Sequence, residues 1–388
     1  MGFHSRNVLN VPGPRRFITP RRFGFICFSR SFGGLELTTL RVASLLARRG
    51  ALPIVIVPEG SPMHAEAKRL ALPTRTIEPR IKYGDISAAF RLARLFRSEK
   101  LDSAIFFRSQ DIHLGAIARM GSSRTHLVFY QQMQSGIGKK DFLHDAVYRR
   151  LSSWLTLTDI MRDEVLRWTN MPPPTVHVAP LGRDPAVYDP SRVSRSAARE
   201  ALGLPARAFV VGILGRLDRQ KGQVELLKTF SEVRARLPNA LYVIAGDETK
   251  NDTGMRAEIR NLASSLDDGS RIRILPPTEN VPQFMRAIDV FAMPSYSETY
   301  GLVLIEAMAM GIPVIATDSG GVPELVRHGK EGILVEPKNV SQLAEAIVLL
   351  GKKKGVRERM GRSGRERFLS RFDESRCTDI LVGHLSSL

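Results

Sequence analysis

The sequence predicts an α/β protein made of two doubly wound, Rossmann-like domains that face a ligand cleft. Short apolar runs alternate with amphipathic stretches along the chain, which is typical of parallel sheets with helices on both faces. The 388 residues exceed the length of one average domain. Prolines and a glycine cluster between residues 180 and 190, and the alternation resumes at Phe209. We therefore expect a domain boundary in this cluster and a cleft at the carboxyl ends of the strands.

The first half of the chain contains four apolar runs of strand length. They are Phe23–Phe28, Leu52–Val57, Ser103–Phe107 and Leu127–Tyr130. Amphipathic stretches with helical spacing separate these runs at Leu35–Arg49 and Asp85–Lys100. This order of strand and helix predicts parallel strands in the first domain.

The second half repeats the same alternation with five apolar runs. They are Phe209–Leu214, Leu241–Ala245, Arg271–Leu275, Val290–Met293 and Pro313–Ala316. Helical patterns lie between them at Gln223–Arg236 and Val281–Ala287. We therefore expect a second parallel sheet rather than a continuation of the first.

The expected domain organisation has four parts. A basic arm over residues 1–22 contains five arginines, three prolines and no acidic residue, which is typical of a disordered segment. A transit peptide is the alternative for this arm. Residues 23–185 and 186–365 form the two Rossmann-like domains, and a C-terminal helix over residues 366–388 packs back toward the first of them.

The net charge of +18 lies mostly in the N-terminal half, where residues 1–180 carry +14 and residues 181–388 carry +4. Such a basic half suits nucleic acid, an anionic membrane or an anionic ligand, or it reflects a generally basic host proteome. Cys27 and Cys377 lie at opposite ends without metal-binding spacing, which favours a reducing compartment. No apolar run reaches the length of about 18 residues that indicates a transmembrane helix. We therefore expect a cytoplasmic protein.

A glycine-bounded loop with two cations follows the predicted strand Phe209–Leu214. It runs from Gly215 to Gly222 and contains Arg216 and Lys221. The planar donor fork of arginine and the point charge of lysine both suit a diphosphate at the end of a parallel strand. A solvated basic loop is the alternative that composition alone leaves open.

Two glutamates eight residues apart frame the start of an apolar helix. Glu298 precedes this helix, and Glu306 lies within it. The backbone N–H groups of Tyr300, Gly301 and Leu302 would lack acceptors inside the helix and can bind a phosphate. Glu298 would then bind sugar hydroxyls, and Glu306 the ribose hydroxyls. The alternatives are an acid favoured by the helix dipole for Glu298 and a buried carboxylate paired with a lysine for Glu306.

Further polar loops follow the predicted strands of the first half. Gly33 and Gly34 would let the backbone approach a ligand closely, although a plain turn explains the pair equally well. The segments 107–113 and 130–136 follow the next two strands. Their polar side chains would face the cleft and orient an acceptor hydroxyl.

These motifs together resemble the retaining nucleotide-sugar glycosyltransferases of family 4, which have the GT-B architecture. The resemblance rests on Gly-Arg-Leu…Lys-Gly within residues 215–222, on the Glu–seven–Glu spacing, and on the glycine-rich run that follows. That run is Gly320-Gly321-Val322-Pro323-Glu324-Leu325-Val326, with Gly329 and Gly332 after it. The resemblance is strong over about residues 205–337 and weaker but collinear over residues 23–200.

The resemblance implies that the C-terminal domain holds most of a UDP-, GDP- or ADP-linked sugar and that the N-terminal domain binds the acceptor. Arg216 and Lys221 would bind the diphosphate. Glu298 would contact the donor sugar, and Glu306 the ribose. The sugar would move to a hydroxyl of a glycolipid, lipopolysaccharide or polysaccharide precursor, with retention at the anomeric carbon.

The resemblance also implies catalysis without a metal ion, and no Asp-x-Asp pair occurs in the sequence. The loop at Gly33 and Gly34 would face the donor phosphate and the acceptor. Many family members carry a histidine after the strand that ends here at Phe107, whereas this chain continues with residues 108–111. Asp111 is our candidate for orienting the acceptor in its place. The alternatives are Gln131, Asp141 and His144.

The helix expected at Asp85–Lys100 has a basic stripe with apolar residues beside it. Its cations stand at every third position, at Arg91, Arg94, Arg97 and Lys100. Such a helix can lie on anionic lipid, and a solvated helix face is the alternative. Because glycosyltransferases of this kind often act on lipid-linked acceptors, we expect a peripheral protein on the inner face of the cytoplasmic membrane.

Two other functions remain open at this point. A nucleotide-sugar epimerase on the same architecture would act without an acceptor. A basic nucleic-acid-binding module would bind polynucleotide in a salt-dependent way but leaves the two glutamates unexplained. Few aromatic residues lie among the basic ones, so we expect no nucleic-acid partner.

Overall fold

The computed structural model describes residues 15–81, 83–121, 124–134, 138–248, 253–267 and 269–388. Residues 1–14 of the predicted arm, and residues 135–136 of the polar segment 130–136, lie outside these ranges. The chain forms two compact units. Unit 1 contains Met1–Gln131, Lys140–Leu155 and Thr378–Leu388, and unit 2 contains Gln132–Lys139 and Thr156–Cys377. Residues 156–185, which the sequence analysis places in the first domain, are thus grouped with unit 2.

The first sheet has seven strands in the order β3-β2-β1-β4-β5-β6-β7. Its strands are β1 Arg22–Ile26, β2 Leu52–Val57, β3 Thr74–Thr76, β4 Ser103–Phe106, β5 His126–Tyr130, β6 Ser153–Thr156 and β7 Val176–Val178. The central strand β1 pairs in parallel with β2, where Phe25 lies opposite Val55, and with β4, where Phe25 lies opposite Ile105. The strand order reverses between β1 and β4, which makes this position the topological switch point of the sheet.

The second sheet has six strands in the order β10-β9-β8-β11-β12-β13. Its strands are β8 Phe209–Leu214, β9 Ala240–Ala245, β10 Ile272–Leu275, β11 Val290–Met293, β12 Val314–Thr317 and β13 Gly332–Val335. All of its pairings are parallel, with Val211 of β8 opposite Val290 of β11. Here the switch point lies between β8 and β11. The two sheets confirm the predicted pair of doubly wound, Rossmann-like domains.

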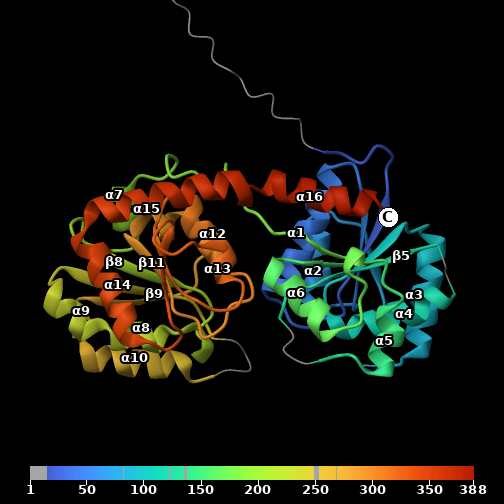
Figure 1. Ribbon diagram of the computed structural model, residues 1–388, viewed down its shortest axis with the longest axis horizontal. Helices are drawn as coiled ribbons and strands as arrows, with labels where there is room; N and C mark the ends of the chain where they lie inside the picture. The colour runs from blue at the N-terminus through green and yellow to red at the C-terminus, as the bar shows by residue number, and fades with distance from the viewer. Residues whose placement is uncertain (1–14, 82, 122–123, 135–137, 249–252, 268) are drawn as a thin grey trace, which may run out of the picture. The chain divides into compact units, whose positions relative to one another are not determined.

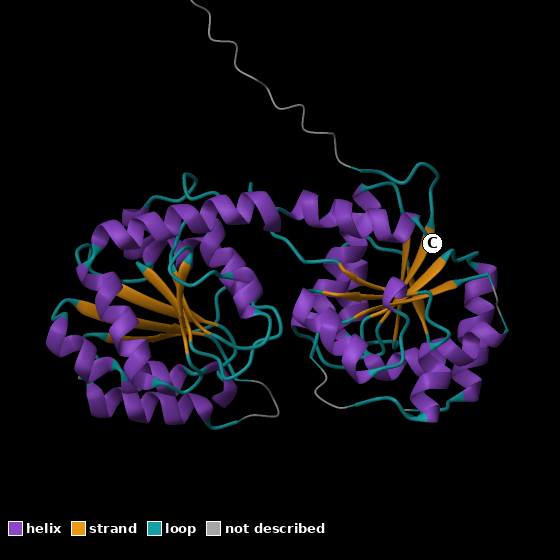
Figure 2. Ribbon diagram, viewed as in Figure 1, coloured by secondary structure: helices purple, strands orange, loops and turns teal. Residues whose placement is uncertain are grey.

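Helices lie on both sides of the strands in each unit (Figures 1 and 2). Those of unit 1 are α1 Gly34–Arg48, α2 Pro62–Arg69, α3 Ile86–Ser98, η1 Ser109–Asp111, α4 Ile112–Met120 and α5 Phe142–Tyr148. Those of unit 2 are α6 Asp159–Trp168, η2 Pro173–Thr175, α7 Arg195–Ala201, η3 Arg219–Lys221, α8 Gln223–Lys228, α9 Phe230–Arg236, α10 Met255–Leu266, α11 Val281–Ala287, α12 Leu302–Ala309, α13 Val322–Leu325, α14 Val340–Lys352, α15 Lys354–Arg367 and the π-helical turn η4 Phe368–Phe372. Helix α16 Glu374–Ser386 follows η4.

The core of unit 2 explains why the sequences of its strands are continuous apolar runs. Helices α8, α9 and α10 lie along one face of the sheet, and α12 and α15 along the other (Figure 1). Val211, Tyr242 and Ile244 from the strands pack with Phe230 of α9 and Ile259 of α10 in one buried cluster. Because strands covered on both faces have no solvated side, their side chains do not alternate between apolar and polar.

The predicted helix Gln223–Arg236 is in fact two helices, α8 and α9, which meet at Thr229. The hydroxyl of Thr229 donates back to the carbonyl of Leu226 at 2.7 Å and lies 2.7 Å from the Tyr242 hydroxyl. A buried threonine that bonds to the preceding turn competes with the helical backbone. The apolar period continues through this break, so the period alone predicts one helix.

Residues 15–22 of the predicted disordered arm are held by unit 1. The backbone N–H of Phe17 donates to the carbonyl of Arg49 at 3.1 Å, and the Phe17 ring lies 5.2 Å from that of Phe23. Arg21 donates to the carbonyl of Leu385 at 2.8 Å. The arm therefore differs from the expectation over its described part, because an apolar side chain anchors it to the fold.

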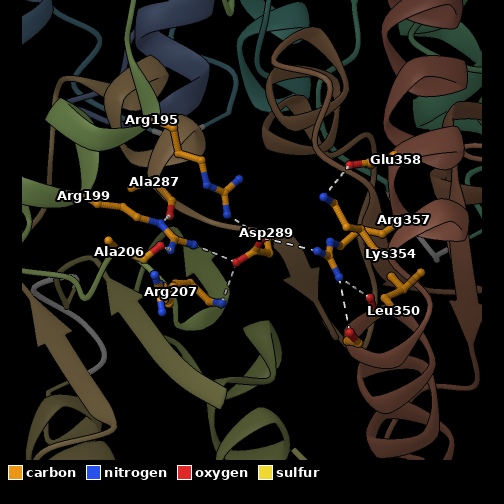
Figure 3. Close-up of polar contacts among 12 residues, drawn as sticks. Arg195, Arg199, Ala206, Arg207, Ala287, Asp289, Leu350, Lys354, Arg357 and Glu358 are labelled. Atoms are coloured by element: carbon orange, nitrogen blue, oxygen red, sulfur yellow. Dashed lines mark hydrogen bonds and ion pairs between the residues drawn. The ribbon is translucent and has the colours of Figure 1, made fainter. Parts of the chain in front are cut away.

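A buried carboxylate at the amino end of β11 connects this strand to α7 and β8 (Figure 3). Asp289 accepts from the backbone N–H of Val210 at 2.8 Å and from Arg199 at 2.8 Å, and it also pairs with Arg195. Arg199 in turn donates to three main-chain carbonyls, one of which belongs to Ala287. This network holds α7 and the loop before β8 against the central strands.

No helix within the described ranges is both long enough and apolar enough to cross a membrane.

Candidate functional site

Two loops of unit 2 meet at the switch point of the second sheet. One follows β8 and runs from Gly215 to Gly222, and the other follows β11 and leads to α12. The backbone N–H of Tyr296 in the second loop donates to the carbonyl of Gln220 in the first at 2.8 Å. A side chain at Gly222 would lie 2.1 Å from the carbonyl oxygen of Pro294, and its φ of +74° also favours glycine. The close approach of the two loops therefore requires a glycine at this position.

The loop after β8 presents its two predicted cations in different ways. Arg216 is largely exposed, with 58% of its side chain accessible, and its guanidinium lies 3.1 Å from the Asp218 carboxylate. Its carbonyl accepts from the Gln223 side chain at 2.7 Å, which fixes the backbone of the loop. Lys221 lies in η3 and is three-quarters buried. Arg216 can thus reorient toward an anion, whereas Lys221 is already held in place.

Lys221 and Glu298 form an ion pair between the two loops. The Lys221 Nζ lies 2.6 Å from Glu298 Oε2, and the two side chains are 27% and 16% exposed. Because this pair is partly shielded from water, its attraction is stronger than that of a surface pair. The ammonium and the carboxylate thus place two charged groups side by side at the carboxyl ends of the strands.

A glycine pair holds the Glu298 loop from the other side. The N–H of Gly321 donates to the Glu298 carbonyl at 2.9 Å. A Cβ at Gly320 would lie 2.2 Å from the same oxygen, and one at Gly321 would lie 2.3 Å from the Thr299 carbonyl oxygen. The Gly320-Gly321 motif of the sequence therefore positions Glu298 through direct backbone contact.

Helix α12 begins where the sequence predicts, with Gly301 before its first residue. Gly301 has a φ of +80°, so the chain turns sharply into the helix. The Tyr300 hydroxyl donates to the carbonyl of Leu181 at 2.7 Å and anchors the turn. The first turn, from Leu302, presents N–H groups and the positive end of the helix dipole beside Glu298.

Glu306 forms a buried ion pair with Arg183. The Arg183 Nε donates to Glu306 Oε1 at 2.6 Å, and the side chains are 14% and 9% exposed. Burial lowers the pKa of Arg183, but the Glu306 carboxylate and Tyr188 raise it above its usual value. The partner is thus an arginine rather than the lysine that the alternative interpretation expects. The second oxygen, Oε2, makes no hydrogen bond with any residue that the structure describes.

Three of the predicted site residues lie in unit 1, at the switch point of the first sheet. The N–H of Gly33 donates to Glu36 Oε2 at 2.9 Å and so closes a capping box at the start of α1. A Cβ at Gly34 would meet no atom within 4 Å. Neither glycine is required by a close contact within unit 1, which leaves the plain-turn interpretation of this pair in place.

Asp111 is 4% exposed and fixes the backbone just after β1. Its Oδ2 accepts from the backbone N–H of Phe28 at 2.9 Å, and its Oδ1 lies 3.7 Å from the guanidinium of Arg108. Burial raises the pKa of Asp111 to about 6, while the Arg108 cation and the hydrogen bond from Phe28 lower it. The carboxyl group can therefore exchange a proton near neutral pH, although it also has a structural contact.

Several residues of the unit 2 site are not predicted from the sequence. Arg183 lies in the cluster of prolines and a glycine between residues 180 and 190, which marks a domain boundary but not a site residue. The Tyr296 hydroxyl donates to Glu225 at 2.8 Å, and Lys338 lies over the Tyr296 ring at 4.5 Å. Thr299 accepts from the N–H of Gln134 at 3.3 Å. These partners are distant in sequence, so no local pattern connects them.

Comparisons with known proteins agree with this arrangement. Residues 194–367 match the family described as Glycosyl transferases group 1, and residues 33–182 match the Glycosyl transferase 4-like domain. A D-inositol 3-phosphate glycosyltransferase of Mycobacterium tuberculosis is 35% identical over 228 residues, which are 58% of this chain and 46% of that protein. The enzyme of the same name from Saccharomonospora viridis is 32% identical over 231 residues, which are 58% of this chain and 53% of that protein. The chain thus spans about half the length of these curated relatives.

Solved structures share the fold over almost the whole chain. A glycosyltransferase from Rickettsia africae is 17% identical with a TM-score of 0.86, covering 96% of this chain and 99% of that one. Alr3699/HepE of Anabaena, solved with UDP and glucose, is 23% identical with a TM-score of 0.80, covering 95% of this chain and 100% of that one. The two matched domains together with the two parallel sheets confirm the resemblance, and the chain belongs to the group 1, family 4-like glycosyltransferases with the GT-B fold.

Proposed function

We propose that the chain transfers a sugar from a nucleotide-sugar donor to a hydroxyl acceptor, with retention at the anomeric carbon and without a metal ion. The observation that carries this proposal is the meeting of Lys221, Glu298 and the start of α12 at one switch point. A cation, a hydrogen-bonding carboxylate and N–H groups at a helix start are the groups that a sugar diphosphate needs.

The donor diphosphate would lie between the β8 loop and α12. Lys221 and Arg216 would bind it from one side, and the N–H groups of Tyr300, Gly301 and Leu302 from the other. As the bond from the sugar to the diphosphate breaks, negative charge grows on the leaving oxygen. Preorganised cations and N–H groups stabilise that charge more than the ground state and so lower the barrier.

The two glutamates would divide the rest of the donor between them. When the diphosphate attracts the Lys221 ammonium, Glu298 becomes available to accept from hydroxyls of the donor sugar. Glu306 would accept from the ribose with Oε2 while Arg183 holds Oε1. Buried polar atoms nearby support a polar ligand, since Gln223 Oε1 and Ser295 Oγ have no hydrogen-bond partner among the described residues.

The acceptor would bind through unit 1, near the loop at Gly33 and Gly34. Asp111 would orient the acceptor hydroxyl, helped by a pKa near 6 that lets it accept a proton close to neutral pH. The acceptor class that we propose is a glycan or lipid-linked precursor of the cell envelope. A peripheral position on the inner face of the cytoplasmic membrane fits such an acceptor and the basic stripe on α3.

A thermal-shift screen of UDP-, GDP- and ADP-sugars tests the donor. UDP comes first because the Anabaena relative was solved with UDP and with UDP-glucose. A donor at a hundredfold excess over its Kd should stabilise the protein by about 2.7 kcal/mol. Turnover should then depend on an added acceptor. Conversion of the donor without an acceptor would favour the epimerase, and no response to any nucleotide-sugar would contradict both.

Three single variants test the diphosphate contacts. Lys221→Ala and Arg216→Ala should each lower kcat by roughly 10²–10³-fold, the usual loss for one preorganised charge stabiliser. Arg219→Ala is the matched control, because Arg219 lies in the same loop but is 67% exposed and pairs with Glu258 at 2.6 Å. Activity within threefold of wild type for both test variants would leave the diphosphate assignment without support.

A further inference from the structure

Unit 2 contains a second cationic site, which the proposed transfer reaction does not use. It is an open pocket of about 690 Å³ formed by the loop before β13, by α15 and by η4. We call it the α15 pocket. Its lining residues are Arg327, Gly329, Lys330, Arg359, Ser363, Glu366, Arg367, Ser370 and Arg371. Five of these are cationic and one is acidic, so the pocket concentrates positive charge.

The pocket and the proposed donor site lie at opposite edges of the sheet. The loop that contains Arg327 and Lys330 leads into the amino end of β13 at Gly332. The donor loops instead leave the carboxyl ends of β8 and β11. Because all pairings of this sheet are parallel, its amino and carboxyl ends form separate edges. The α15 pocket is therefore a separate site.

The helix wall of the pocket follows one face of α15. Arg359, Ser363, Arg367 and Ser370 are spaced by four, four and three residues, which places them in one row on a helix. The row continues into η4, where Arg371 completes the wall. The cations thus converge on one space.

Two of the arginines are already held in position by the fold. Glu331, whose side chain is fully buried, accepts from Arg327 through Nε and NH2. Arg367 donates from Nε to the carbonyl of Leu325 and from NH2 to that of Glu324, both at 2.7 Å. In both arginines NH1 donates to no residue that the structure describes. Each guanidinium is therefore held in place while its NH1 group can donate to a ligand.

The positive charge of the pocket is not balanced from within unit 2. The side chains of Lys330, Arg359 and Arg371 make no hydrogen bond or ion pair with any described residue. The pKa of Arg367 lies below its usual value, chiefly because the group is buried. The Glu331 carboxylate raises this pKa, whereas the charges of Arg327 and Arg371 lower it further. An anion in the pocket would relieve this repulsion.

The arginine cluster at Asp289 gives the contrast within the same unit (Figure 3). There Arg195 and Arg199 both pair with one buried carboxylate, and Arg199 and Arg357 also donate to main-chain carbonyls. All three arginines of that cluster thus pair with the same acceptor, the Asp289 carboxylate. In the α15 pocket, Arg327 and Arg367 have comparable acceptors, but the side chains of Lys330, Arg359 and Arg371 have none among the described residues.

We propose that the α15 pocket binds a phosphorylated ligand through Arg327, Arg367 and the three cations without a partner. Planar guanidinium groups donate to phosphate in pairs, and lysine adds a point charge. Several cations in one pocket match a group with two or more negative charges, such as a diphosphate or a phosphomonoester. The phosphate belongs either to a free small molecule or to a lipid headgroup.

Calorimetric titration with inorganic pyrophosphate tests the site. The titration uses the full chain carrying Lys221→Ala, so that the proposed donor site contributes little. In this background, Lys330→Glu with Arg359→Glu should weaken pyrophosphate binding by roughly tenfold or more, because two attractive charges become repulsive. Arg371→Glu is a second, independent variant. All three positions are exposed, so we expect the fold to tolerate them.

Arg362→Glu is the matched control, since Arg362 is exposed on the same helix but does not line the pocket. It should leave pyrophosphate binding unchanged. Phosphatidylcholine vesicles with and without phosphatidic acid form the second arm, with the same variants. Loss of pyrophosphate binding in the pocket variants assigns a free phosphate ligand, and loss of vesicle binding alone assigns a headgroup. Equal behaviour of pocket and control variants in both arms would overturn the proposal, and would leave the donor site untouched.

Discussion

Replacing Arg183 with methionine should destabilise unit 2, because the change leaves the Glu306 carboxylate without its cation. The two groups meet at 2.6 Å with side chains that are 14% and 9% exposed. Methionine keeps most of the length and apolar volume of the arginine stem. The backbone of Arg183 stays anchored, since its N–H donates to Phe372 and its carbonyl accepts from Glu374. The loss is therefore confined to the side-chain pair.

The expected size of the effect follows from the burial of this pair. Removal of one partner of a buried ion pair costs about 3–5 kcal/mol, because the remaining charge loses both water and its counterion. We expect about 3 kcal/mol for Arg183→Met, at the lower end of that range, since both groups keep some contact with solvent. Replacement of both partners, by Arg183→Met with Glu306→Met, should return to within about 1 kcal/mol of wild type. The double-mutant cycle should thus show a coupling of about 2 kcal/mol or more.

Urea denaturation followed by circular dichroism measures the three variants against wild type. Titration with UDP follows on the folded proteins, because Glu306 is also our candidate for the ribose contact. Glu306→Gln should weaken binding of the free nucleotide, whereas Glu298→Gln should lower kcat with the intact donor and leave nucleotide affinity nearly unchanged.

Two results would refute this reasoning in different places. A cost below about 1 kcal/mol for Arg183→Met would mean that the pair is screened like a surface pair. An equal loss of nucleotide affinity in Glu306→Gln and Glu298→Gln would mean that the two glutamates do not divide ribose and sugar between them.

Three other predictions address pH, membrane and metal. Asp111→Asn should raise the free energy of unfolding above that of wild type, and this gain should be larger at pH 8 than at pH 4 by up to about 3 kcal/mol. A shift of one pKa unit corresponds to about 1.4 kcal/mol. The sign follows from the raised pKa: above about 6 the buried carboxylate is charged in both the folded and the unfolded state and carries its full cost, and below about 4 it is neutral in both. Equal effects of the variant at both pH values, in parallel urea titrations, would contradict it. Co-sedimentation with anionic vesicles should fall when Arg91, Arg94 and Arg97 become Glu, and it should fall with salt as the Debye length shortens. Binding to neutral vesicles that ignores these changes would instead indicate the exposed Phe90 ring, which is 69% accessible. Transfer should persist in excess EDTA, and a loss restored only by Mg²⁺ or Mn²⁺ would reject metal-independent catalysis.

The local sequence pattern is enough to predict several central strands and to indicate that they are parallel. Strands β2, β8 and β11 begin and end at the predicted residues, because buried parallel strands are short, continuous apolar runs. Four strands, β3, β6, β7 and β13, are not among the predicted ones. The first three lack such a run, whereas β13 is a short apolar run at Gly332–Val335. The backbone of these strands pairs with an adjacent strand of the sheet, and a local sequence pattern does not show such a pairing. The break at Thr229 likewise depends on Tyr242, a partner on another strand.

Local spacing in the sequence is enough to predict a two-sheet α/β chain with a glycine-bounded cationic loop and two spaced glutamates. Which of these residues meet depends on tertiary packing, because the partners are far apart in the chain. Lys221 and Glu298 are 77 positions apart, and Arg183 and Glu306 are 123 positions apart. Lys221 and Glu298 come together because the strand order reverses between β8 and β11, so that two distant loops meet at the carboxyl end of the sheet. Arg183 is instead held by backbone hydrogen bonds to Phe372 and Glu374. The same holds for the α15 pocket, whose cations come from a loop and a helix that only packing places side by side.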